Sequence, residues 1–64
     1  MATNNRLKAA RVLKGMTQLQ LAELVGLKEV EISRFEPGRG TPSPENKQRM
    51  ANALATPAWK IFDS

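Results

Sequence analysis

The pattern of apolar and polar positions is clearest over residues 18–37, where it predicts two short helices joined by a tight turn. Leu21 and Val25 lie four residues apart, so they share one face of the first of these helices. The small side chain of Ala22 would let a second helix approach closely. Gly26 follows the last apolar residue, where glycine takes the left-handed conformation that ends a helix at the least cost.

The second of these helices is predicted over about residues 29–35. Leu27 fills the turn before it, and Ile32 and Phe35, three residues apart, form its inner face. Two such helices crossing at a steep angle form a helix-turn-helix, here over about residues 17–36. In that motif the second helix is shaped to enter the major groove of DNA.

The two helices differ in their start signals. Thr17 is a good N-cap for the earlier helix, and Gln20, three residues later, completes a capping box. Lys28 is a poor N-cap for the later helix. Leu27 and Ile32 have the spacing of a hydrophobic staple, so packing is the alternative means of fixing that start.

A further helix is predicted before the motif, over about residues 5–14. Asn4 or Asn5 serves as its N-cap, and Gly15 stands at its end. Leu7 and Ala10 belong to its buried face. Periodicity alone leaves open whether Val12 or Leu13 joins them.

Two more helices are predicted after the motif. Residues 37–44 form a loop rich in proline and glycine, and Ser43 followed by Pro44 starts a helix that runs to about Ala55. Thr56 and Pro57 repeat the same start signal for a last short helix. The residues expected in the core are Met50, Ala53 and Leu54, then Trp59 with Ile61 or Phe62.

No strand pattern or internal repeat is present, so the chain is predicted to be all-α: one domain, residues 1–64, formed as a small bundle of about five helices. A chain of 64 residues buries only about 60% of the surface that its unfolded form exposes, so its stability is expected to be modest. Carboxylates are few and lie on helical surfaces, so no catalytic residue is assigned and an enzyme is not expected.

The composition of the chain narrows the classes of function and of partner that fit it. Ten Lys and Arg against six Asp and Glu give a net charge of +4 and a pI near 10.2, which suits an anionic partner such as nucleic acid. The alternative is that four excess charges only keep the protein soluble. The chain has no cysteine and no histidine, so no metal site or cofactor is expected, and no small-molecule ligand. With no apolar span and no signal sequence, a cytoplasmic, nucleoid-associated protein is expected.

The chain resembles the Xre/Cro-type helix-turn-helix domains of phage repressors and bacterial regulators, over about residues 6–62. The similar segments are Met-Thr-Gln at 16–18, Leu-Ala-Glu at 21–23, Val-Gly-Leu at 25–27, Ile-Ser-Arg-Phe-Glu at 32–36, and Ala53, Leu54 and Trp59. The resemblance implies a lambda repressor-like fold. The chain departs from the family at Lys28, where Ser or Thr is usual, at Pro37, and at residues 55–57, which lack a glycine.

The resemblance also implies a DNA site. Lys28, Glu29, Val30 and Arg34 match the positions that read bases. The positions toward the DNA backbone are Thr17, Gln18, Glu31, Ser33, Arg39 and Thr41. Arg11 and Glu36 resemble a structural ion pair that ties the first helix to the end of the third.

Chemistry permits these roles and also simpler ones. Arg34 can bond guanine O6 and N7, or it can pair with Glu31 on the helix surface. Val30 can pack on a thymine methyl group, and Glu29 or Glu31 can accept from cytosine N4. The two glutamates can equally serve only to stabilise the helix dipole, by roughly 0.3–1 kcal/mol each. Thr17 can act as a cap alone, with Gln18, Arg39 and Thr41 merely solvated.

The function expected from these features is sequence-specific binding of double-stranded DNA by a transcriptional regulator of Cro/repressor type, from a phage or prophage, acting by operator occupancy. The resemblance implies a homodimer through the C-terminal segment, with Phe62 as a better candidate for the contact than Trp59. The alternative is a protein-interaction module on the same fold, an adaptor or anti-repressor. The leucines outside the core pattern, Leu13, Leu19 and Leu24, favour that alternative if they cluster.

Overall fold

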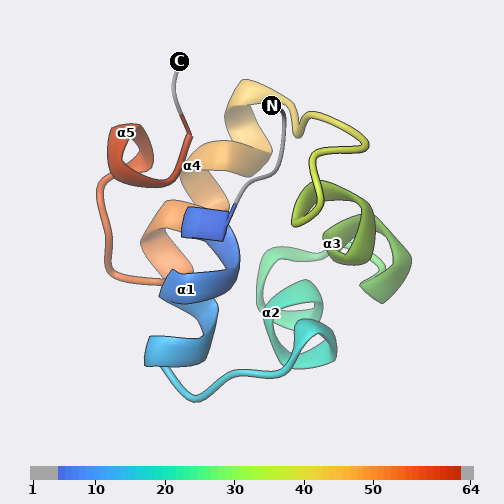
Figure 1. Cartoon of the computed structure of the whole chain (residues 1–64), viewed down its shortest axis with the longest axis horizontal. Coiled ribbons are helices and arrows are strands. Elements are labelled where there is room, and N and C mark those ends of the chain that lie inside the picture. The colour runs from blue at the N-terminus through green and yellow to red at the C-terminus, as the bar shows by residue number, and fades with distance from the viewer. Residues whose placement is uncertain (1–4, 63–64) are drawn as a thin grey trace.

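The computed structural model describes residues 5–62, which form an all-α bundle without strands (Figure 1). Its helices are α1 (Asn5–Leu13), α2 (Gln18–Val25), α3 (Glu29–Phe35), α4 (Pro44–Ala53) and α5 (Ala58–Ile61). Helix α2 packs against both α3 and α4, while α5 packs against α1 and α4. As a result α3 lies at one side of the bundle and α1 with α5 at the other (Figure 1).

The predicted capping of the helix-turn-helix is confirmed. The Gln20 backbone N–H donates to Thr17 Oγ1 at 3.1 Å, and the Thr17 N–H donates to Gln20 Oε1 at 2.8 Å. Gly15 and Gly26 take the left-handed conformation, with φ of 68° and 74°. At Gly26 this conformation ends α2 and turns the chain toward α3, so the sharp turn between the two helices has its cause in the sequence.

The start of α3 is fixed by a glutamate. The Lys28 side chain makes no capping bond, as expected, but the Lys28 backbone N–H donates to Glu31 Oε1 at 3.0 Å. This is the half of a capping box in which the third helical residue reaches back to the cap. The bond gives the backbone N–H of the N-cap residue a partner, while the other half of the box, from the N-cap side chain to the first turn, is not formed.

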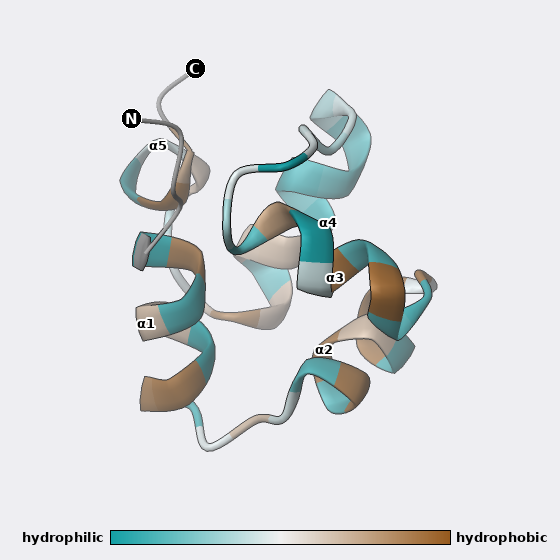
Figure 2. Cartoon of the chain, turned by 45° about the vertical axis from the view of Figure 1, so that its right-hand side comes forward, coloured by the Kyte–Doolittle hydropathy of each residue, from teal (hydrophilic) through white to brown (hydrophobic). Residues whose placement is uncertain are grey.

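The core is a cluster of apolar side chains contributed by all five described helices and the residues beside them. Leu21, Ile32, Met50 and Leu54 are wholly inaccessible to solvent. Full burial of a side chain of this size stabilises a fold by about 1.5–3 kcal/mol. Figure 2 shows both hydrophobic and hydrophilic residues along α3, as expected of a helix with one buried face. The buried cluster comprises Leu7, Leu21, Ala22, Val25, Ile32, Met50, Ala51, Leu54, Ile61 and Phe62.

Two predictions about the C-terminal segment are wrong. Trp59 was expected in the core, but it is 69% exposed. Phe62 was expected either in the core or as a dimer contact; it is buried, with 5% exposure, so the core placement is confirmed and the contact is wrong. Helix α5 has a single turn, and Ile61 and Phe62 occupy the space against the core. Trp59 precedes Ile61 by two residues, which is about 200° around a helix, so it points to solvent.

Smaller corrections concern helix ends. Helix α1 ends at Leu13 and α4 at Ala53, one and two residues earlier than predicted. Ala53 and Ala10 are half-buried, and Ala51 is the buried alanine of α4. Val12 and Leu13, between which periodicity did not decide, are both exposed, and the proposed cap Asn4 lies outside the described residues.

The turn after α4 explains why that helix stops early. Ala55 has a φ of 51°, in the left-handed region, and the Thr56 N–H donates to the Ala51 carbonyl at 3.0 Å. This is the bonding of a helix end that usually carries glycine. The chain therefore forms the usual turn in spite of lacking the glycine.

Candidate nucleic-acid interface

The outward face of α3 is polar and accessible, as the position of its apolar residues predicted. Ile32 is fully buried and Phe35 half-buried, so the opposite side of the helix points to solvent. Ile32 packs into the hydrophobic core, and this contact fixes the side of α3 that faces outward. The exposed residues of this face are Lys28, Glu29, Val30, Ser33 and Arg34.

Arg34 is available to a ligand. It is exposed, and within residues 5–62 its guanidinium has no ion-pair or hydrogen-bond partner. The surface pair with Glu31 that the sequence permitted is not formed. A free arginine on an exposed helix face can make the bidentate contact that guanine offers in the major groove.

The two glutamates of α3 lie in different environments. Glu31 is half-buried, and its carboxylate accepts from the Lys28 N–H, so it stabilises the start of the helix. Glu29 is exposed and has no side-chain partner within the described residues. Only Glu29 therefore adds an unengaged negative charge to the outward face.

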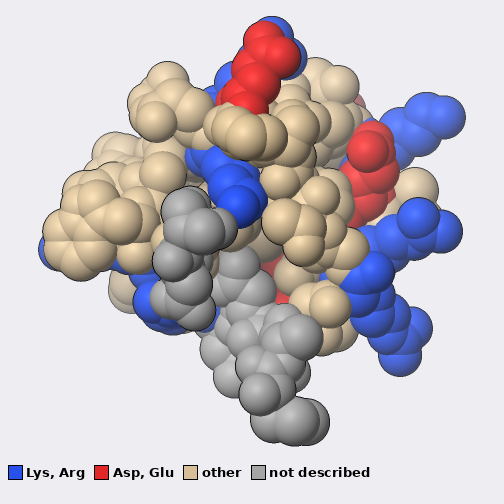
Figure 3. Space-filling view, turned by 90° about the horizontal axis from the view of Figure 1, so that it is seen from above, with Lys and Arg blue, Asp and Glu red and all other residues tan. Residues whose placement is uncertain are grey.

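The loop after α3 continues the same surface. Gly38 has a φ of 80°, and the Arg39 backbone N–H donates to the Arg34 carbonyl at 2.9 Å, which folds the loop back on the last turn of α3. The side chains of Arg39 and Thr41 are exposed. In Figure 3 Lys and Arg side chains gather at the side of the molecule where α3 and this loop lie, with an acidic side chain among them.

The start of α2 carries the other predicted backbone contacts. Thr17 is exposed; its hydroxyl accepts from the Gln20 N–H and its own N–H donates to Gln20 Oε1, so these two N–H groups are used in the capping box at the positive end of α2. Gln18 is half-buried, and its Nε2 donates to Glu36 Oε1 at 3.0 Å. One amide hydrogen of Gln18 is thereby used within the protein, which orients the side chain at the edge of the surface.

The predicted ion pair is present and is the centre of a larger network. Arg11 Nε lies 2.6 Å from Glu36 Oε2, and the two side chains are only 11% and 6% exposed. Arg11 Nη2 also donates to Glu36 Oε1 at 3.3 Å, and Nη1 donates to the Met16 carbonyl at 2.7 Å. With Gln18 on the same carboxylate, the network joins α1, the start of α2 and the end of α3.

Sequence reasoning missed two parts of this arrangement. It gave Glu31 a role toward DNA or the helix dipole and did not identify it as the acceptor for Lys28, although the spacing of three residues was visible. It also did not foresee that Gln18 would bind Glu36. No local sequence signal could reveal that contact, because the two residues are 18 positions apart.

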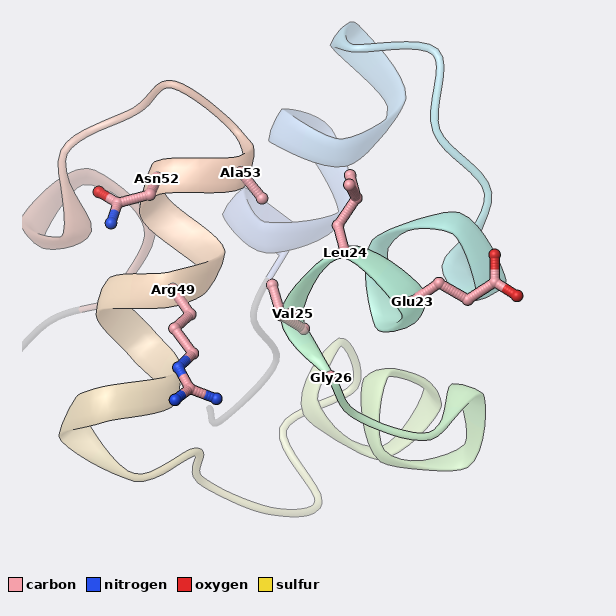
Figure 4. A pocket seen from close by; sticks show the side chains of 7 residues that line it. All are labelled: Glu23, Leu24, Val25, Gly26, Arg49, Asn52 and Ala53. Carbon is pink, nitrogen blue, oxygen red and sulfur yellow. The ribbon is translucent and has the colours of Figure 1, made fainter.

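One pocket lies away from the outward face of α3. A shallow pocket between the end of α2 and α4 is lined by Glu23, Leu24, Val25, Gly26, Arg49, Asn52 and Ala53 (Figure 4). Figure 4 shows Arg49 extending along α4 and Glu23 pointing away from α4. Arg49 already pairs with Glu45 at 2.9 Å, so the pocket offers no unpaired cation.

Leu13, Leu19 and Leu24, which did not fit the core pattern, are indeed exposed, by 85%, 47% and 62%. Within residues 5–62, no three His, Cys, Asp or Glu side chains gather as metal ligands would. In the same part of the chain, none of the helices combines the length and apolar character that crossing a membrane requires.

Comparison with known sequences identifies the family. The sequence model of the helix-turn-helix family HTH_3 matches residues 7–58, which is most of the chain. The chain belongs to this family of Xre-type helix-turn-helix proteins, and its fold and its class, a DNA-binding domain of transcription regulators, follow from that membership. No match was found among curated proteins.

Solved structures of regulators have the same fold as this chain. The restriction-modification controller protein C.AhdI from Aeromonas hydrophila is 32% identical, with a TM-score of 0.85 over 92% of this chain and 89% of that one. PlcR from Bacillus thuringiensis, solved in complex with the peptide PapR7 and DNA, is 36% identical with a TM-score of 0.83, over 91% of this chain but only 20% of PlcR. The clp gene regulator ClgR from C. glutamicum is 28% identical with a TM-score of 0.82, over 94% of this chain and 78% of ClgR.

Proposed function

We propose that this chain is a sequence-specific regulator of Cro/repressor type, which lays α3 in the major groove of an operator and acts by occupying it. The single observation that carries the proposal is the exposed face of α3, on which Arg34 has no partner within residues 5–62. Similarity to a controller protein, to a gene regulator and to a protein solved with DNA supports a role in transcription. The proposed activity is binding, and no catalysis is assigned.

In this proposal the residues of α3 divide into two groups. Arg34 bonds guanine, and Lys28, Glu29 and Val30 contact the neighbouring base edges. Ser33 and Glu31 lie toward the DNA backbone, where Glu31 acts through the helix start that it caps. Carboxylates near phosphates repel, so the exposed Glu29 weakens nonspecific binding and makes the protein more dependent on its base contacts.

Phosphate contacts in this proposal come from both sides of α3. The positive end of α2, beside Thr17 and Gln18, favours an anion, and the exposed Arg39 and Thr41 follow α3 on its other side. Glu36 holds Gln18 in place, so the register of α2 on the DNA backbone is coupled to the position of α3. Such contacts position a protein on DNA and make its affinity depend on salt.

We further propose a homodimer through the C-terminal segment. The buried Phe62 leaves Trp59 as the large exposed side chain of α5, and a large aromatic is a frequent anchor of interfaces. Symmetric dimers of this class bind half-sites about one helical turn, ~34 Å, apart. Sedimentation of the wild type and of Trp59→Ala checks the assignment: loss of the dimer is expected in the variant, and an unchanged dimer would place the interface elsewhere.

The alternative, a protein-interaction module, is favoured by the exposed leucines Leu13, Leu19 and Leu24 and by the acidic residues of α3. A titration with random-sequence duplex DNA across salt concentrations separates the two. The proposed function requires binding that weakens steeply as salt rises, because phosphate contacts release counterions. Selection from a random DNA pool should then enrich one motif; absence of any DNA affinity at low salt would favour the interaction module.

A further inference from the structure

We propose that Val30 and Arg34 act together to read a pyrimidine–guanine step through the 5-methyl group of the pyrimidine. The domain would then bind thymine–guanine and 5-methylcytosine–guanine steps and discriminate against the unmethylated cytosine–guanine step. This inference rests on the proposed function, because it requires α3 to lie in the major groove.

The spacing of the two residues supports the pairing. They are four positions apart, one turn of α3, which is about 6 Å along the helix axis. Long side chains in a helix lean toward its N-terminus, so the guanidinium of Arg34 can extend over the turn that carries Val30. Successive bases on a strand are about 3.4 Å apart, so both side chains reach the same or adjacent base pairs.

The chemistry of the two side chains is complementary to one kind of step. Val30 is 58% exposed, an apolar side chain on a face that is otherwise polar. The 5-methyl group is the apolar feature that a pyrimidine presents in the major groove, and guanine presents the N7 and O6 acceptors that suit arginine. A methyl group beside the guanine would bury the Val30 side chain while Arg34 makes both of its bonds.

The surrounding charges leave this pair free to act. Glu31 lies between Val30 and Arg34 in sequence and could have neutralised the arginine, but its carboxylate is engaged by the Lys28 N–H. Arg34 has no partner within residues 5–62. Valine carries no polar group, so it contacts the methyl of thymine and of 5-methylcytosine alike, whereas cytosine offers it nothing.

The test uses the duplex selected from a random pool and changes only the methyl group. Thymine before the guanine is replaced by deoxyuracil, and in a second pair cytosine at that place is compared with 5-methylcytosine. Each methyl group is expected to raise the affinity of the wild type about fourfold, the value for burying one methyl-sized group. In Val30→Ala that methyl effect should fall to less than twofold.

Val12→Ala is the matched control, because Val12 is 56% exposed but lies on α1. It should keep the full methyl effect. Equal affinity of the wild type for duplexes with and without the methyl group would overturn the inference while leaving the proposed function intact, as would a methyl effect that persists in Val30→Ala. Failure to select any site would instead overturn the proposed function.

Discussion

Arg11 and Glu36, 25 residues apart in sequence, form a two-bonded ion pair that is almost closed to solvent. The pair joins α1 to the residue directly after α3, and Glu36 also accepts from Gln18 at the start of α2. The helix that would read DNA and the helix that would contact its backbone are therefore held by one carboxylate. The network therefore fixes the start of α2 and the end of α3 relative to each other.

Arg11→Met should destabilise the domain severely. Removing one member of a buried pair costs about 3–5 kcal/mol because the other charge is left without a partner. A domain of this size has a stability of only about 3–5 kcal/mol, so the variant should be largely unfolded by circular dichroism at 25 °C.

Glu45→Gln is the control for that experiment, because it breaks an ion pair whose side chains are 75% and 54% exposed. Its loss should cost only about 1 kcal/mol, because the exposed pair contributes about 0.3–0.5 kcal/mol and the charge of Glu45 in the first turn of α4 contributes a similar amount. An Arg11→Met protein that melted at the wild-type temperature would show that the buried pair does not hold the helices together.

Glu31→Ala should destabilise the domain by about 1 kcal/mol, because the Lys28 N–H loses its acceptor at the start of α3. Glu31→Gln keeps an acceptor oxygen and should recover at least half of that loss. Urea unfolding curves of the two variants measure the difference. Equal destabilisation by both substitutions would mean that the charge of Glu31, and not its hydrogen bond, supports the helix.

Ala55→Gly should stabilise the domain. A left-handed conformation costs a residue with a Cβ about 1–2 kcal/mol, and glycine adopts it freely. The greater freedom of glycine in the unfolded chain offsets about 0.5–1 kcal/mol of that gain. Thermal unfolding should show a net gain of about 0.5–1 kcal/mol, whereas a lower melting temperature would contradict the strain at Ala55.

The helix-turn-helix could be predicted from sequence because its signals are local. Thr17 and Gln20 form a capping box within four residues, and Gly26 ends α2 at the position that the apolar pattern indicated. The bounds of α3 agree with the prediction because Ile32 and Phe35 define its inner face. The exposure of the opposite face then follows from helical periodicity.

The C-terminal segment could not be predicted because its contacts are tertiary. Trp59, Ile61 and Phe62 are all large and apolar, and a helix of one turn is too short for periodicity to choose among them. The packing of α5 against α1 and α4 decides which of them faces the core. The hydrogen bond between Gln18 and Glu36 could not be predicted from the sequence for the same reason, because it depends on how α2 and α3 pack together.

Arg39→Ala should weaken DNA binding without changing sequence preference. Arg39 lies in the loop after α3, where its exposed side chain would contact a phosphate and no base. Loss of one phosphate contact should lower affinity for all sequences alike. It should also reduce the slope of the logarithm of the binding constant against the logarithm of salt concentration by about one. Fluorescence anisotropy on several duplexes across salt concentrations measures both effects; a change in preferred sequence would place Arg39 on a base.

The most direct measurement is a comparison of wild type and Arg34→Ala on the selected duplex and on its single-base variants. Arg34→Ala should lose about 1–3 kcal/mol of binding free energy on the selected site and should no longer distinguish bases at one position, while keeping its preference at the others. If Arg34→Ala bound the selected site with the affinity and base preferences of the wild type, the outward face of α3 would not be the surface that reads DNA.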